Sequence, residues 1–190
     1  MPLLVSPAIA SGALRSLPQP VLGTSLVLRP WTTADAPVVL SAFSCPDIQR
    51  WHVRTMADTD ESLAWILGWP VRWDAETDAS WAITSGGAVV GQVGLRTISL
   101  FEASAQVSYW VLPSARGAGI AWRAARLLSR WCFDTLQLNR LSLLHSTANL
   151  ASCRVAERAS FLLEGTQRKS LQHADGWHDV HVHARLRCDG

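Results

Sequence analysis

The sequence predicts a single α+β domain, a mixed β-sheet with helices packed on both faces. Three observations support this fold class: three consecutive strand-like segments are separated by short turns, a long amphipathic helix follows them, and a strand, a helix and a hairpin close the chain. The 190 residues are 48% hydrophobic and 17% charged, enough to bury one core without disulfides or metal. We therefore expect one domain over residues 24–187, preceded by a flexible extension at residues 1–23.

The first half of the domain begins with a strand and a helix. Residues 24–31 alternate and are β-branched enough for a strand, and Thr33 or Asp35 can then cap a helix that reaches about Ser44. A second helix is expected after Asp58, because Glu61 three residues later completes a capping-box pattern. This helix is expected to end at or before Trp69, because Pro70 follows it.

The middle of the chain predicts an antiparallel meander followed by a long helix. Strands are expected at residues 80–84, 89–99 and 105–112, with Gly86 and Gly87 forming the first turn. Apolar residues then recur with helical period from Gly119 to about Leu138. After a strand at 140–145 and a helix at 150–159, residues 161–171 and 177–187 read as a closing hairpin around Asp175 and Gly176.

Composition excludes several classes of protein. The net charge of +2 and the scattered arginines argue against a nucleic-acid partner. Charged residues, proline or glycine break every apolar run before the ~20 residues of a membrane span, and residues 1–23 lack the features of a signal peptide. The four cysteines form no C-x-x-C pair, so neither a disulfide framework nor a zinc motif is indicated. We expect a reducing cytoplasm.

The segment from Arg116 to Ala121 joins an apolar strand to the long helix through small residues. Such a turn leaves several backbone N–H groups unpaired at the positive end of the helix dipole, and glycine lets phosphates approach the backbone closely. The spacing matches neither the P-loop nor the dinucleotide fingerprint, and no acidic residue follows for a ribose contact. A plain connecting loop remains the alternative to a pyrophosphate-binding turn.

Three motifs resemble one known family. Arg116-x-x-Gly119-x-Ala121 satisfies [Q/R]-x-x-G-x-[G/A], residues 149–165 are similar to N-x-x-S-x-x-[VL]-x-E-[KR]-x-G-F-x-x-E-G, and residues 26–36 match an L-R-P opening with a downstream D-A. Together these motifs resemble the RimJ/RimL-like branch of the GNAT N-acetyltransferase superfamily, from about Thr24 to Leu186. The resemblance implies the GNAT acyl-CoA N-acyltransferase fold with splayed fourth and fifth strands. It also implies acetyl-CoA as cosubstrate and direct attack by an amine in a ternary complex.

The same resemblance assigns residues to the cofactor. The backbone of Tyr109, Trp110 and Val111 would bind the thioester oxygen and pantetheine. The pyrophosphate would be bound by the amides of Arg116, Gly117, Ala118, Gly119, Ile120 and Ala121. Asn149 matches a position that bonds the pantetheine arm, although an Asn before a helix is also an ordinary cap. Ser152 matches the position proposed to protonate the leaving thiolate, although it is also simply a small residue in a first helical turn.

Gln106 stands where many relatives carry a glutamate that accepts the amine proton through water. At pH 7 an α-amine of pKa ~8 is about 10% neutral, whereas a lysine-like amine of pKa ~10.4 is only about 0.04% neutral. Either the acceptor amine is weakly basic, which we favour, or His145 at the end of a strand serves as base, although a histidine there is more often structural.

In this family the first two helices and their loop wall the acceptor pocket. Substrate-binding candidates there, together with Gln106, are Trp51, His52, Arg54, Trp65 and Trp69, the alternative for the tryptophans being plain core packing. His178, His181 and His183 suggest a metal, but no third ligand is spaced for zinc, so we expect none.

The acceptor stays open between a protein N-terminal α-amine and the amine of a small molecule. A non-catalytic acyl-CoA-binding domain is the alternative function, and a homodimer remains an option.

Overall fold

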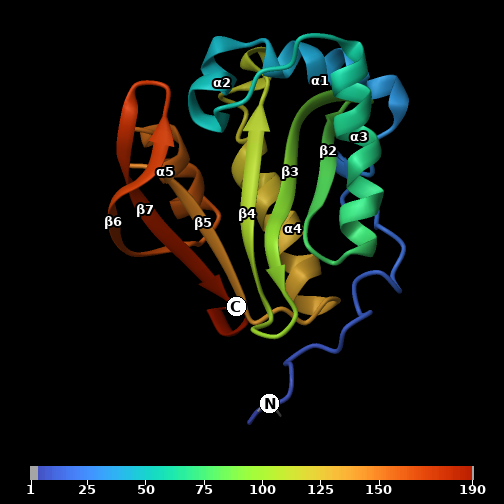
Figure 1. Ribbon diagram of the computed structural model, residues 1–190, viewed down its shortest axis with the longest axis vertical. Helices are drawn as coiled ribbons and strands as arrows, with labels where there is room; N and C mark the ends of the chain where they lie inside the picture. The colour runs from blue at the N-terminus through green and yellow to red at the C-terminus, as the bar shows by residue number, and fades with distance from the viewer. Residues whose placement is uncertain (1–3, 190) are drawn as a thin grey trace.

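The computed structural model describes residues 4–189 and contains one seven-stranded sheet with the order β1-β2-β3-β4-β5-β7-β6 (Figure 1). Every neighbouring pair is antiparallel except β4 and β5, which run parallel. The predicted meander and closing hairpin are confirmed. The strands are β1 (Leu26–Arg29), β2 (Ala79–Ser85), β3 (Ala88–Ser99), β4 (Ser104–Val111), β5 (Arg140–Ser146), β6 (Leu162–His173) and β7 (Gly176–Leu186).

Helices cover both faces of the sheet, as the α+β prediction requires (Figure 1). They are α1 (Ala36–Phe43), α2 (Pro46–His52), α3 (Thr59–Asp74), α4 (Ile120–Asp134) and α5 (Leu150–Arg158). The short helix α2 was missed, although Pro46 at its first position is a standard start signal. Within residues 4–189, none of the helices combines the length and the apolar composition that a membrane crossing requires.

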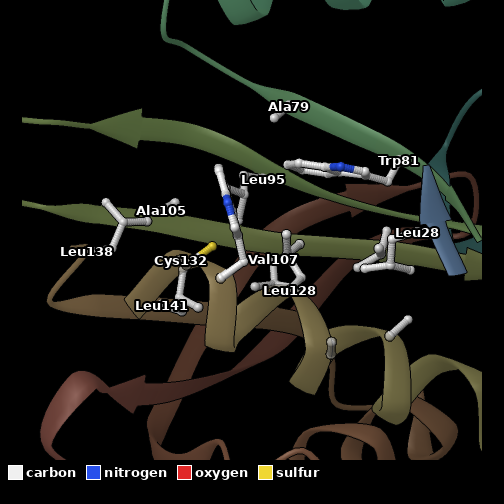
Figure 2. Packing of buried hydrophobic residues seen from close by; sticks show 14 of the residues in the cluster. Leu28, Ala79, Trp81, Leu95, Ala105, Val107, Leu128, Cys132, Leu138 and Leu141 are labelled. Atoms are coloured by element: carbon white, nitrogen blue, oxygen red, sulfur yellow. The ribbon is translucent and has the colours of Figure 1, made fainter. Parts of the chain in front are cut away.

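The core lies mainly between the sheet and α4 (Figure 2). Leu128 and Cys132 of α4 are fully buried there against side chains of β2, β3 and β4, of which Trp81 and Leu95 are also fully buried. A second cluster joins α1, α3 and Trp110 on β4. The sheet is therefore buried on both faces along β2, β3 and β4. This packing holds β4 in position.

Part of the extension expected to be a flexible lead-in packs against the domain. Leu14 is fully buried, and the carboxylate of Glu76 accepts hydrogen bonds from the backbone N–H groups of Gly12, Leu14 and Arg15 at 2.7, 2.8 and 3.2 Å. Leu22 pairs with Leu28 of β1. Residues 12–22 therefore lie against the domain, since Leu14 is buried in its core and Glu76 accepts hydrogen bonds from the amides of this segment.

The expected end of α3 at or before Trp69 is wrong, since the helix continues through Pro70 to Asp74. A proline inside a helix costs about 3 kcal/mol. Continuing the helix buries Trp73, whose ring lies 6.0 Å from the rings of both Trp81 and Trp131. Burying an indole of that size contributes about 4–6 kcal/mol, which exceeds the cost of the proline.

Asp35 joins β1 to α1 and is almost completely buried. Its carboxylate accepts two hydrogen bonds from Arg29, at 2.7 and 2.8 Å, and one from the N–H of Thr32 at 2.9 Å. Burial opposes ionisation, but these hydrogen bonds outweigh it and hold the pKa of this carboxyl below its usual 3.8.

Asp35→Asn is expected to lower the free energy of unfolding by about 1.5–3 kcal/mol at pH 7, because the charge-assisted bonds are lost. A carboxyl whose folded pKa is lowered stabilises the fold above its unfolded pKa of about 4, and this contribution disappears as the pH falls through the folded pKa. Urea unfolding of both proteins should therefore show a gap at pH 7 that narrows below pH ~4. An equal gap at both pH values would contradict the assignment.

Candidate active site

The parallel strands β4 and β5 separate partway along their length. They are paired from Ser104 with Arg140 to Gln106 with Ser142, and not beyond, although β4 continues to Val111 and β5 to Ser146. This confirms the splayed strands expected from the fold class. Gln106 lies at the point where the two strands part.

The turn from β4 into α4 presents a row of free backbone donors. In the part of the chain that the structure describes, the N–H groups from Gly117 to Trp122 donate to no acceptor of the protein. Gly117 and Gly119 have φ angles of 84° and 71°, in the left-handed region that glycine adopts without strain. A Cβ on Gly119 would lie 2.5 Å from Nε1 of Trp122. The predicted strand–turn–helix geometry is thus present, with its amides unpaired.

The opened strands, this turn and α5 enclose a cleft of about 790 Å³. Most of the predicted site residues line it: Trp51, His52, Gln106, Tyr109, Trp110, Val111, Arg116, Gly117, Gly119, Ile120, Ala121, His145, Asn149 and Ser152. Asp47 is the single acidic residue among the lining residues that the structure describes, and it forms a 2.7 Å ion pair with Arg116. Three arginines line the cleft, so its charge suits an anionic ligand.

Four of the predicted residues do not line the cleft. Ala118 belongs to the turn and is exposed outside the cleft lining, and Arg54 is exposed after α2. Trp65 and Trp69 lie in the second core cluster, with their rings 5.1 Å apart, and Trp65 packs edge-on against Trp31 and Phe43. The core alternative therefore holds for these two tryptophans, because the apolar face of α3 is turned to the sheet and α1.

Helix α5 contributes Asn149 and Ser152 to the cleft. The side-chain oxygen of Asn149 accepts a hydrogen bond from the N–H of Ser152 at 3.1 Å, so Asn149 is a helix cap, and its amide nitrogen remains available. The phenol of Tyr109 lies beside Ser152. Burial raises the pKa of this phenol to about 12, against the opposing effect of the Ser152 hydroxyl. The Tyr109 side chain was not among the predicted groups, because only its backbone has a counterpart in the family motif.

His52 and Trp51 close the end of the cleft near α2. Nε2–H of His52 donates to the carbonyl of Tyr109 at 2.9 Å, and burial lowers the pKa of this imidazole to about 4. His173 of β6 joins the hairpin to α2, since its Nδ1 lies 2.9 Å from the carbonyl of Arg50, and its ring lies 5.8 Å from that of Trp51. His173 also lines the cleft and was not predicted, because the register of the hairpin decides where it falls.

His145 lines the cleft, but both of its ring nitrogens face neighbouring protein atoms. Nδ1 lies 2.8 Å from the carbonyl oxygen of Ser146, and Nε2 lies 3.2 Å from Nε2 of His183. Burial lowers the pKa of His145 below its ordinary value. Nε2 is thus directed at His183 rather than at a group bound in the cleft.

Two further potential metal ligands lie near His181 and His183 in space, although none is spaced for zinc along the sequence. His145 of β5 and Cys153 of α5 bring a nitrogen and a sulfur to within 4.8 Å of both. His178, grouped with them by sequence, lies apart and contacts Asp175 and Ser146 instead. Spacing along the sequence could not reveal this cluster, because its members come from three separate elements.

The comparisons with known proteins point to one family. The profile described as "Acetyltransferase (GNAT) domain" matches residues 25–162. A Bacillus subtilis protein, "Putative ribosomal N-acetyltransferase YdaF", is 31% identical over 101 residues, which span 53% of this chain and 55% of that protein.

Two solved structures share the fold. RimL, a ribosomal alpha-N-protein acetyltransferase in complex with coenzyme A, superimposes with a TM-score of 0.80 at 20% identity, covering 88% of this chain and 98% of RimL. RimJ of Mycobacterium smegmatis, in complex with CoA-disulfide, gives a TM-score of 0.78 at 23% identity, covering 88% of this chain and 86% of RimJ.

Proposed function

The chain belongs to the GNAT acetyltransferase family, and we propose that it transfers the acetyl group of acetyl-CoA to the α-amine of a protein N-terminus. The observation that carries the proposal is the row of unpaired N–H groups from Gly117 to Trp122 at the mouth of a cleft between separated strands. Oriented amides at a helix N-terminus bind phosphate oxygens, and the parted strands leave room for an extended arm between them.

The arginines of the cleft support the same orientation of the cosubstrate. Arg154 and Arg158 line the cleft from α5, and both were missed by sequence reasoning. Their guanidinium groups are suited to the remaining phosphate of coenzyme A. With the phosphates held at the turn, the acetyl group lies between β4 and β5, near Gln106, Tyr109 and Ser152.

Transfer then requires an oriented amine, a polarised thioester carbonyl and a proton for the leaving thiolate. We assign carbonyl polarisation to the backbone N–H groups of β4 around Tyr109 to Val111, and the proton to the hydroxyl of Ser152. Because the Tyr109 phenol remains neutral well above pH 7, it can donate a hydrogen bond to Ser152 as that hydroxyl passes its proton to the thiolate. The attacking nitrogen gives up one proton when the amide forms, and this proton restores the Ser152 hydroxyl. No covalent intermediate on the protein is needed.

The acceptor class follows from what the cleft lacks. Gln106 cannot accept a proton, the Asp47 carboxylate is paired with Arg116, and His145 directs Nε2 at His183. Without a base at the Gln106 position, an amine that arrives already neutral is favoured, and an α-amine of pKa ~8 meets this condition better than an alkyl amine of pKa ~10.4. The names of the ribosomal N-acetyltransferase relatives support a protein N-terminus as the source of that amine.

The direct test is release of free thiol from acetyl-CoA in the presence of candidate acceptors. We expect turnover with peptides that carry a free N-terminus, none with the same peptides blocked at the N-terminus, and little with lysine side chains or aminoglycosides. Turnover restricted to aminoglycosides would show that the acceptor is the amine of a small molecule and not a protein N-terminus. Coenzyme A binding without turnover on any amine would instead support the non-catalytic alternative.

The pH dependence of the reaction should be set by the acceptor. Below the pKa of the amine, kcat/KM is expected to rise about tenfold per pH unit and then level off near that pKa, about 8 for an α-amine. His52, with its pKa near 4, stays neutral throughout this range. Two peptides whose N-terminal pKa values differ should shift the profile by the same difference. A break that stays at one pH for both peptides would reveal a base on the protein.

A further inference from the structure

Three histidines and a cysteine meet between the sheet and α5. This histidine–cysteine cluster consists of His145 on β5, His181 and His183 on β7, and Cys153 on α5. His145 stands directly opposite His181 in the strand register, so their side chains share one face of the sheet with that of His183. One nitrogen or sulfur atom from each residue lies within 4.8 Å of those of the other three.

Two of the imidazoles face each other through their unprotonated nitrogens. Nδ1 of His145 lies 2.8 Å from the Ser146 carbonyl oxygen, and Nδ1 of His183 lies 3.3 Å from that of Phe161. A carbonyl oxygen only accepts, so each Nδ1 carries the hydrogen and each Nε2 has a lone pair. These two Nε2 atoms are 3.2 Å apart. Facing lone pairs repel each other unless a positive charge lies between them.

The other two members also have side-chain atoms that lack a strong partner. Nδ1 of His181 is buried and meets no hydrogen-bond partner in residues 4–189. The Cys153 thiol has one weak contact, at 3.7 Å to a carboxylate oxygen of Glu157 one helical turn later. That carboxylate adds negative charge next to the cluster, which favours a cation there. The unpartnered buried nitrogen and the two facing lone pairs are separate observations, and both favour a cation in the cluster.

We propose that the histidine–cysteine cluster binds one zinc ion, with three imidazole nitrogens and the Cys153 sulfur as ligands. Zinc accepts nitrogen at about 2.0–2.1 Å and thiolate at about 2.3 Å in a tetrahedron, which places two nitrogen ligands about 3.3 Å apart. The Nε2 atoms of His145 and His183 are already at 3.2 Å. On binding, the thiol proton of Cys153 passes to solvent and a zinc–sulfur bond forms, with no change of oxidation state. The carbonyls of Ser146 and Phe161 orient the two rings from behind.

The ion would tie α5 to the sheet. Within its bounds α5 fully buries only Ala156, so apolar packing anchors it weakly. Its N-terminal turn carries Asn149 and Ser152 into the cleft, and Cys153 follows directly. Zinc bonded to Cys153 from one side and to β5 and β7 from the other fixes this turn in place. The proposal concerns metal uptake, so its test does not depend on the proposed acetyl transfer.

Chelator-treated protein should take up one zinc ion per chain, measured by elemental analysis after desalting. Cobalt(II), used as a spectroscopic probe, should give the intense visible bands of a tetrahedral site and a sulfur-to-metal charge-transfer band. Zinc should also raise the melting temperature of the protein, because only the folded chain gathers the four ligands.

Cys153→Ser and His183→Ala should each weaken zinc binding by more than ~100-fold. Loss of a residue that only hydrogen-bonds to a ligand costs about 10–100-fold, and loss of a ligand itself should cost more. Cys153→Ser should also abolish the sulfur charge-transfer band. Cys188→Ser and His178→Ala serve as matched controls, since both residues lie outside the cluster, and should bind zinc like the unmodified chain. Cys153 is half-buried on a helix, so its replacement could affect folding. The far-UV circular dichroism of metal-free Cys153→Ser reports whether that variant folds.

No zinc uptake at micromolar free ion would overturn the proposal and leave a proton shared by His145 and His183. Equal uptake by folded Cys153→Ser and the unmodified chain would overturn it as well. So would loss of uptake in His178→Ala, or one ion for every two chains.

Discussion

Ser152→Ala is expected to lower kcat by about 10²–10⁴-fold, the range over which a positioned proton donor acts. The hydroxyl lies in the first turn of α5, lines the cleft and has the neutral Tyr109 phenol beside it. Only the N–H of Ser152 serves the helix cap, by donating to Asn149, and alanine keeps that N–H. The fold and the affinity for coenzyme A should therefore change little. Steady-state kinetics and calorimetry on the same preparation measure both quantities.

Ser170→Ala provides a matched control. Ser170 is exposed on β6, and its hydroxyl donates a hydrogen bond to Gln167. The substitution removes a serine hydroxyl outside the cleft, so kcat should stay at the value of the unmodified chain. Tyr109→Phe should give a smaller loss than Ser152→Ala, since it removes only the supporting hydroxyl. An unchanged kcat in Ser152→Ala, or a loss carried entirely by coenzyme A affinity, would contradict the assigned role.

Gly119→Ala is expected to weaken coenzyme A binding by about tenfold or more. The φ angle of Gly119 is 71°, where an L-residue pays roughly 1–2 kcal/mol. The free turn can relax to relieve this strain, and restoring the binding conformation then lowers the affinity by a factor of about 5–30. The new Cβ would also lie 2.5 Å from Nε1 of Trp122, so the turn must shift and its amides lose their common direction. Calorimetric titration with coenzyme A measures the change.

Gly86→Ala separates this local effect from general strain. Gly86 also has a positive φ, 56°, but lies in the turn between β2 and β3, where an added Cβ meets nothing within 4 Å. It should lower the stability of the protein by about 1 kcal/mol and leave the affinity for coenzyme A unchanged. If Gly86→Ala weakened binding as much as Gly119→Ala, the turn before α4 would have no special part in binding.

Local signals in the sequence predicted most of the fold. The N–H of Glu61 donates to the Asp58 side chain and the Glu61 carboxylate accepts from the N–H of Ala57, so the expected cap begins α3. The C-terminal end of α3 could not be predicted in this way. Pro70 is a local signal, whereas the burial of Trp73 against Trp81 and Trp131 depends on segments far away in the chain.

The residues of the site also divide into those that a local sequence pattern predicts and those whose place depends on tertiary packing. The turn at Gly117 and Gly119 is continuous in the sequence, so its glycines and its place before a helix could be read directly. Trp65 and Trp69 occupy positions that suit either a core or a pocket wall, and only the packing of α3 decides between them.

The histidine–cysteine cluster lay beyond sequence reasoning for a related reason. The register of β5 against β7 brings His145 to His181, and α5 then supplies Cys153. A one-residue slip of that register would turn His145 to the other face of the sheet, and no local pattern states the register.

The central claim is that the free amides between β4 and α4 bind the diphosphate of coenzyme A. Calorimetry of the unmodified chain with coenzyme A and with pantetheine, which lacks the phosphates, tests this most directly. We expect coenzyme A to bind with one site per chain and pantetheine to bind at least ~100-fold more weakly, a difference of about 2.7 kcal/mol. Equal affinity for the two compounds, or no heat with coenzyme A, would contradict the account.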